Sequence, residues 1–178
     1  CSVLSVRDSE LAQALNNLKQ PPALVITDSQ AFKKVAEIVP ENIPLTSFSI
    51  LFARLKGDLD AFEHGANAID HLQDNDKVLI LESCTHHAID DDIGRGKIPN
   101  LLRKKTGKNL IIENFSGHDF PDISGYKLIV HCGACMTNRR QVLSRILIAN
   151  QKGIPITNYG IAISYCLGIL PRALKIFK

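Results

Sequence analysis

The sequence predicts an α/β protein, with parallel sheets covered by helices, arranged as two small α/β units. Short, continuous apolar runs occur at 23–27 (ALVIT), 78–81 (VLIL) and 128–131 (LIVH). Runs of this kind are typical of buried parallel strands. Between them, apolar residues recur every three or four positions, which is the spacing of helices that pack on a sheet. The alternation of the two patterns indicates repeated strand–helix units.

The first predicted unit covers residues 1–45. Pro40 and Pro44 mark its end, because two prolines in five residues interrupt both helices and strands. In chain order, the unit is expected to contain a strand at 2–6, a helix from 9 to about 18, a strand at 23–27 and a helix from 28 to 39.

The second predicted unit covers residues 46–178. It opens with a helical pair over 47–72, interrupted near Gly57, whose broad apolar face indicates packing in the core rather than a membrane or cofactor role. The elements that follow are expected as strands at 78–81, 108–113, 128–131 and 154–157, with helices over 98–106, 136–151 and 159–167 and a last turn or helix to 177.

The composition is that of an ordinary globular protein, with 178 residues, 45% hydrophobic residues and a formal net charge of +3. Basic residues are scattered among acidic ones, so no nucleic acid or anionic membrane is expected as a partner. No run of 18 apolar residues occurs and the start lacks a secretory pattern, so we expect a cytoplasmic protein. Because the chain begins with Cys1 and a strand-like run, we expect it to start inside a larger protein.

Three cysteines lie where predicted strands end. Cys84 follows the run at 78–81, and Cys132 and Cys135 follow the run at 128–131, with Cys135 expected in the first turn of the next helix. In open parallel sheets, ligands bind beyond the carboxyl ends of the strands, and adjacent strands are about 5 Å apart. If these two strands are neighbours, the three thiolates share one site, and thiolates favour an iron-sulfur cluster or zinc.

Three kinds of site remain open from the residues alone. An iron-sulfur cubane needs a fourth ligand, which His86, the aspartates at 90–92 or His131 could supply. A zinc site could use the same three cysteines with a histidine. The third alternative is a thioredoxin-like thiol-disulfide oxidoreductase, in which Cys132 is the activated thiol and Cys135 resolves the mixed disulfide.

The two cysteine segments, CTHH at 84–87 and HCGAC at 131–135, resemble the HydF family of iron-iron hydrogenase maturation proteins. The motif of that family is Cys-x-His followed, some tens of residues later, by His-Cys-x-x-Cys. The resemblance extends over nearly the whole chain, through LVITDSQAF at 24–32, PLTSFSILFARLKGD at 44–58, DDIGRGKIP at 91–99, NRRQVLSRI at 138–146 and PITNYGIAI at 155–163.

The resemblance implies a three-part protein with a GTPase domain, a dimerisation domain and a domain that binds a 4Fe-4S cluster. On this basis, residues 1–45 are a partial dimerisation domain and residues 46–178 are the cluster-binding domain. The chain has no G-x-x-x-x-G-K-[ST] phosphate loop, so GTP is expected only in a domain outside it, and no catalytic activity is expected of the chain itself.

The resemblance also implies the ligands and partners. Cys84, Cys132 and Cys135 would bind the cluster, with Asp91 as the first candidate for the exchangeable fourth ligand, His86 as the second and His131 as the third. The domain would be a scaffold that receives a diiron precursor made by two radical-type maturases and delivers it to apo iron-iron hydrogenase. The intact protein is expected to be a homodimer.

Overall fold

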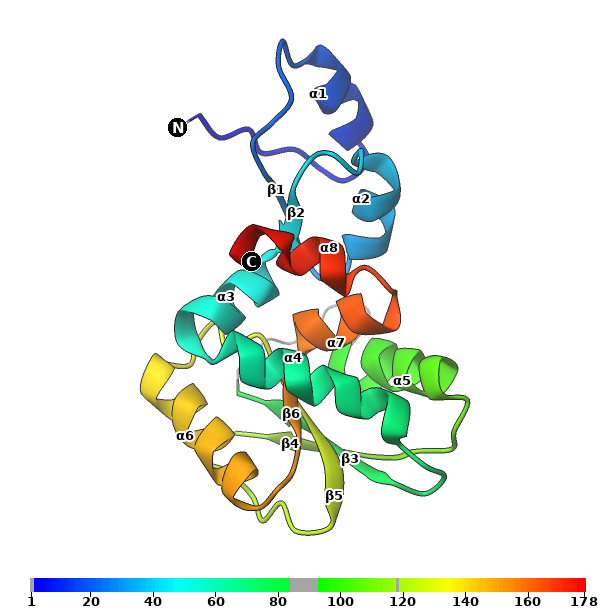
Figure 1. Cartoon of the computed structure of the whole chain (residues 1–178), viewed down its shortest axis with the longest axis vertical. Helices are drawn as coiled ribbons and strands as arrows, with labels where there is room; N and C mark the ends of the chain where they lie inside the picture. The colour runs from blue at the N-terminus through cyan, green and yellow to red at the C-terminus, as the bar shows by residue number, and fades with distance from the viewer. Residues whose placement is uncertain (1, 84–92, 118) are drawn as a thin grey trace.

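The computed structural model describes residues 2–83, 93–117 and 119–178. The larger part of it is built around a four-stranded parallel sheet (Figure 1). The strand order is β4-β3-β5-β6, and every neighbouring pair is parallel. The two inner strands are buried over most of their length, whereas β4 lies at an edge and is half exposed. The strands are β3 (Lys77–Glu82), β4 (Ile111–Ser116), β5 (Tyr126–His131) and β6 (Ile156–Asn158).

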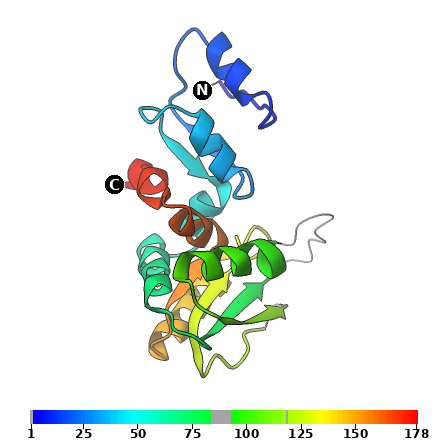
Figure 2. The same ribbon diagram turned by 90° about the vertical axis from the view of Figure 1, so that its right-hand side faces the viewer.

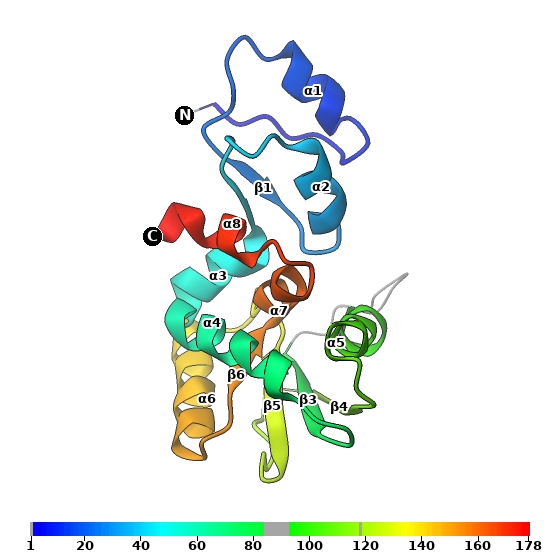
Figure 3. The ribbon, with the colours of Figure 1, turned by 45° about the vertical axis from the view of Figure 1, so that its right-hand side comes forward.

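Helices cover this sheet, as the α/β prediction requires. Helix α7 contacts both α4 and α5, so the three form a continuous layer beside the sheet, and α6 packs against β6 (Figure 3). The longest helix, α6, has 13 residues, and every helix in the described ranges is too short or too polar to cross a bilayer. Their bounds are α4 (Leu59–Asn67), α5 (Ile98–Thr106), α6 (Arg139–Gln151) and α7 (Tyr159–Cys166), with η1 (Ala68–His71) after α4 and the π-helix η2 (Ile93–Lys97) before α5.

A smaller unit at the N-terminal end has a two-stranded parallel sheet of its own. It lies at one end of the molecule, with α3, α7 and α8 between it and the larger sheet (Figures 1 and 2). The predicted division between residues 45 and 46 falls inside β2, and it stays a prediction. The elements are α1 (Leu11–Asn17), β1 (Val25–Thr27), α2 (Phe32–Ile38) and β2 (Leu45–Ser47), followed by α3 (Phe48–Lys56).

The C-terminal segment returns to this smaller unit. Helix α8 (Leu170–Leu174), followed by the short η3 (Lys175–Phe177), packs against β2. The guanidinium of Arg172 donates to the carbonyl oxygens of Val39 at 2.8 Å and of Ile43 at 3.3 Å. The first and last parts of the chain are therefore held together by hydrogen bonds as well as by apolar packing.

Three predicted element positions are wrong. Residues 2–6 form no strand, and Val3 and Leu4 are 89% and 61% exposed, because no strand in the described residues pairs with this segment. Helix α6 begins at Arg139 rather than near 136, because Asn138 and Gln141 form a capping box that fixes its first turn. The strand predicted at 108–113 is shifted to Ile111–Ser116.

Helix α4 crosses β6 at very close range. A Cβ atom at Gly65 would lie 2.0 Å from the carbonyl oxygen of Ile156, which is far inside van der Waals contact. The neighbouring atom belongs to the backbone of a buried strand, so it cannot move aside as a flexible side chain could. The packing of α4 on the sheet therefore requires glycine at this position.

We predict that Gly65→Ala lowers the free energy of unfolding by about 3 kcal/mol, because the added methyl group forces α4 away from β6. Urea denaturation followed by circular dichroism measures this change. Gly96→Ala is the matched control, since a Cβ atom at Gly96 meets nothing within 4 Å. Equal stability of the two variants would contradict the close crossing.

Candidate metal centre

The strands that precede Cys84 and Cys132 are neighbours. Leu81 of β3 pairs with His131 of β5, and the pairing continues past the strand ends, because the amide of Cys132 donates to the carbonyl oxygen of Leu81 at 2.8 Å. Ser83, directly after β3, and Cys132, directly after β5, therefore lie side by side at the carboxyl edge of the sheet. This adjacency is the condition that a shared site of the three cysteines requires.

The thiol of Cys132 is buried at this end of the sheet, which we call the cysteine corner: Ser83 after β3 and residues 131–135 at and after the end of β5. The side chain is 5% exposed, and its Sγ accepts a hydrogen bond from the backbone amide of Ser83 at 3.3 Å. An N–H donor directed at sulfur stabilises the thiolate form and tunes a metal bound to it. The residue that makes this contact comes directly before Cys84 in the sequence.

Cys135 lies in an exposed turn after β5, not in the first turn of a helix as predicted. Ala134 adopts a left-handed backbone conformation with φ of 56°, and its carbonyl oxygen accepts from the amide of Thr137 at 3.1 Å. Helix α6 starts only after Asn138, so its N-terminal dipole acts several residues beyond Cys135. The turn exposes Cys135 while Cys132 stays buried.

A lysine from α3 holds this turn in place. The Nζ of Lys56 donates to the carbonyl oxygens of Ala134 at 2.9 Å and of Cys135 at 2.8 Å. In the opposite direction, the guanidinium of Arg139 donates to the carbonyl oxygen of Leu55. The cysteine turn is thus joined to a helix that lies about eighty residues earlier in the sequence.

His131 is almost completely buried, at 1% exposure, and both of its ring nitrogens have partners. Nδ1 lies 2.8 Å from the carbonyl oxygen of Cys132, and Nε2 lies 2.8 Å from Nη1 of Arg145. Because arginine only donates, Nε2 is the acceptor and Nδ1 carries the proton. His131 therefore connects Arg145 to the backbone of Cys132.

The predicted ligands divide into two groups. His131 ends β5, and Cys132 and Cys135 follow it in the described residues, with Cys132 buried and Cys135 exposed. Cys84, His86 and Asp91 lie outside the described residues. Within the described ranges, no group of three or more His, Cys, Asp or Glu side chains is placed to hold a metal ion.

Three residues that hold the segments around Cys132 and Cys135 are not predicted from the sequence: Ser83, Lys56 and Arg145. Only Arg145 carries a signal in the sequence, because it occupies the inward face of α6 together with Val142 and Ile146. An arginine at a core position of an amphipathic helix indicates a buried polar partner.

Comparison with known proteins gives two matches that together cover nearly the whole chain. Residues 60–176 match the Hydrogen maturase F tetramerization domain, and residues 1–57 match the Hydrogen maturase F dimerization domain. The chain belongs to the hydrogen maturase F family. A search of curated proteins found no match.

Membership of the hydrogen maturase F family confirms the resemblance to HydF and assigns the chain a role in hydrogenase maturation. The metal-centre corner draws on both matched regions. Lys56 lies in the dimerization match, and the turn that it holds lies in the tetramerization match. The two matched regions of this hydrogen maturase F chain therefore meet at Cys135.

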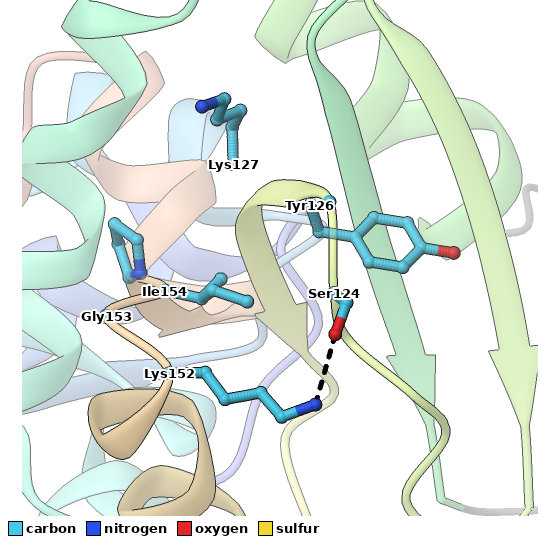
Figure 4. Close-up of a pocket in the computed structure, with 8 residues that line it drawn as sticks. Ser124, Tyr126, Lys127, Lys152, Gly153 and Ile154 are labelled. Atoms are coloured by element: carbon cyan, nitrogen blue, oxygen red, sulfur yellow. Dashed lines mark hydrogen bonds between the residues drawn. The ribbon is translucent and has the colours of Figure 1, made fainter.

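A shallow hollow lies at the opposite edge of the sheet, where β5 and β6 begin (Figure 4). Lys152 donates there to the hydroxyl of Ser124 at 3.2 Å and to a carboxylate oxygen of Asp122 at 2.8 Å. The hydrogen bond from Lys152 holds the pKa of the Asp122 carboxyl below its ordinary value. The lysine is thus used for local structure, and the hollow is separate from the cysteine corner.

We predict that Cys135 is alkylated much faster than Cys166 in the native, metal-free protein. Cys135 is exposed, whereas burial raises the pKa of the Cys166 thiol to about 11. Near pH 8, only about one Cys166 side chain in a thousand is therefore ionised. Timed reaction with iodoacetamide, read by mass spectrometry of peptides, measures both rates. Unfolding in urea is the control and should equalise them, and equal rates in the native protein would contradict the placement.

Proposed function

We propose that this chain binds a 4Fe-4S cluster through Cys84, Cys132 and Cys135 and acts as a scaffold in hydrogenase maturation. In this function it carries a diiron precursor and delivers it to apo iron-iron hydrogenase. The observation that supports the proposal best is the hydrogen bond from the Ser83 amide to Sγ of Cys132, at 3.3 Å. It joins the residue before Cys84 directly to the sulfur of the second cysteine.

The donor set suits an iron-sulfur cluster. Thiolates are the usual ligands of such clusters, and hydrogen bonds to their sulfur atoms set the reduction potential. Cys132 is buried and receives such a bond, and Cys135 is exposed next to it. One buried and one open sulfur would anchor a cluster at the sheet edge while leaving one side of it accessible to other molecules.

The exposure of the two thiols supports a dithiol oxidoreductase less well than it supports a cluster site. In that chemistry the first cysteine attacks the substrate and must be reachable. Here the first cysteine, Cys132, is 5% exposed, and the second, Cys135, is the exposed one. The arrangement is the reverse of what a thioredoxin-like reaction needs.

We propose that the fourth ligand comes from the segment after Cys84, with Asp91 as the first candidate and His86 as the second. His131 is the weaker candidate, because both of its nitrogens are engaged with Arg145 and the Cys132 carbonyl. A hard oxygen ligand holds iron less firmly than thiolate does. An exchangeable position of this kind suits a scaffold that accepts a precursor and then releases it.

The proposed partners are two radical-type maturases, which supply the diiron precursor, and the hydrogenase apoprotein, which receives it. The two matched domains are named for dimerization and tetramerization, which supports self-association of the intact protein. GTP would act through a further domain of that protein. The metal centre described above would then be repeated in each subunit of the assembly.

The proposal predicts that anaerobic reconstitution with iron and sulfide gives a 4Fe-4S signal in electron paramagnetic resonance of the reduced protein. Cys84→Ser, Cys132→Ser and Cys135→Ser should each abolish or strongly alter the signal, because each removes a proposed thiolate ligand. Cys166→Ser is the matched control and should keep the full signal, since Cys166 lies on α7 outside the corner.

Two results would contradict the cluster proposal. One is the absence of a cubane signal in the wild-type chain, and the other is an unchanged signal in Cys84→Ser. Stoichiometric zinc in the protein as isolated, with unfolding by a chelator, would instead support the zinc site. A reductase activity that disappears in Cys132→Ser would support the dithiol alternative.

We predict that Asp91→Ala retains the cluster but shifts its resonance signal, because water or another weak ligand replaces the carboxylate. Iron and sulfide content should stay at the wild-type level. Asp90→Ala and Asp92→Ala are matched controls from the same run of aspartates. A wild-type spectrum for Asp91→Ala would move the assignment to His86.

A further inference from the structure

We propose that Arg145 is a positioning residue of the metal centre. Its guanidinium holds the turns after three strands in register and stabilises negative charge on the sulfur ligands. This inference rests on the proposed cluster function, and it adds a residue that belongs to neither cysteine motif.

Arg145 is a charged side chain inside the core, with 4% of its surface exposed. It lies on the inward face of α6 beside the buried Val142 and Ile146. Burying a guanidinium is costly unless hydrogen bonds and nearby negative charge compensate for the lost water. Burial lowers the pKa of Arg145, while a thiolate at Cys132 would act in the opposite direction and favour the charged guanidinium.

The partners of Arg145 come from the ends of three neighbouring strands. Nη1 donates to the hydroxyl of Ser83, after β3, and to Nε2 of His131, at the end of β5, at 2.8 Å. Nη2 donates to the carbonyl oxygens of Gly117 at 3.4 Å and Asp119 at 3.5 Å, which follow β4. The planar, multi-donor guanidinium suits this task better than an ammonium group would.

Through two of these partners, Arg145 acts on both sides of Cys132. The hydroxyl of Ser83 accepts a hydrogen bond from Arg145, and the amide of Ser83 donates to Sγ of Cys132 at 3.3 Å. Nε2 of His131 also accepts from Arg145, and Nδ1 of His131 lies 2.8 Å from the carbonyl oxygen of Cys132. One side chain therefore fixes both the sulfur and the backbone of this ligand.

The electrostatic consequence concerns the reduction potential. A cluster held by thiolates gains one more negative charge when it takes up an electron from an external reductant. A buried cation and an N–H···S hydrogen bond beside the sulfur both favour the reduced state. Removing Arg145 should therefore shift the potential to a more negative value, which loss of packing alone would not do in a consistent direction.

The test compares reduction potentials in anaerobic redox titrations of the reconstituted protein, monitored by electron paramagnetic resonance. Arg145→Met should shift the potential to a more negative value and change the spectrum. Arg145→Lys restores the charge but not the fork of donors, so its potential should lie between those of Arg145→Met and the wild type. Arg140→Met, at an exposed arginine of the same helix, is the matched control and should match the wild type.

Ser83→Ala covers the case in which Arg145→Met does not fold. It removes only the hydroxyl that receives Nη1, and it should shift the potential in the same direction by a smaller amount. Wild-type potentials and spectra in Ser83→Ala and Arg145→Lys would overturn the inference. If the wild-type chain itself binds no cluster, the proposed function is wrong, and this outcome is distinguishable from a failure of the Arg145 inference alone.

A second measurement does not need the cluster. Amide hydrogen exchange of Ser83 and Cys132 in the metal-free protein should be faster in Arg145→Lys and Ser83→Ala than in the wild type, because the two turns lose their shared support. Arg140→Met should leave both amides at the wild-type rate. Unchanged protection in the first two variants would overturn the positioning role even without a bound cluster.

Discussion

The parallel pairing of β3 with β5 is the constraint on which the proposed metal centre depends. The pairing extends beyond the regular strands through the bond from the Cys132 amide to Leu81, and then through the bond from the Ser83 amide to the Cys132 sulfur. Ser83 and Cys132, the residues that directly follow β3 and β5, are therefore held together at the end of the sheet. A thiol at the end of β5 is thus tied to the chain leading into the Cys84 segment before any metal binds.

The corner is completed by long basic side chains from other elements. Lys56 of α3 binds two carbonyl oxygens of the cysteine turn, and Arg145 of α6 binds the ends of three strands. Arg172 of α8 acts similarly where the C-terminal segment meets the smaller unit. In each case a cation satisfies backbone carbonyls or polar groups that would otherwise be costly to bury. The contacts of Lys56 and Arg172 also link the two matched regions of the family.

Much of the fold could be predicted from the sequence because buried parallel strands appear as continuous apolar runs, as at 78–81 and 128–131. The segment at 2–6 (SVLSV) is also predicted as a strand but forms none, since pairing depends on a partner that local sequence does not reveal. The cysteines could be recognised by their spacing and position. The partners of Lys56 and Arg145 could not be predicted. Lys56 and Cys135 are 79 positions apart in the sequence and Arg145 and Ser83 are 62 apart, so only the fold brings them into contact.

We propose that the adjacent ends of β3 and β5 hold one iron-sulfur cluster. The most direct test is an anomalous difference map, recorded at the iron absorption edge, from crystals of the anaerobically reconstituted protein. We expect iron about 2.3 Å from Sγ of Cys132 and of Cys135, as in thiolate-bound metal sites, with the third thiolate from Cys84. A single zinc ion at this corner, or a disulfide between Cys132 and Cys135 with no metal, would contradict it.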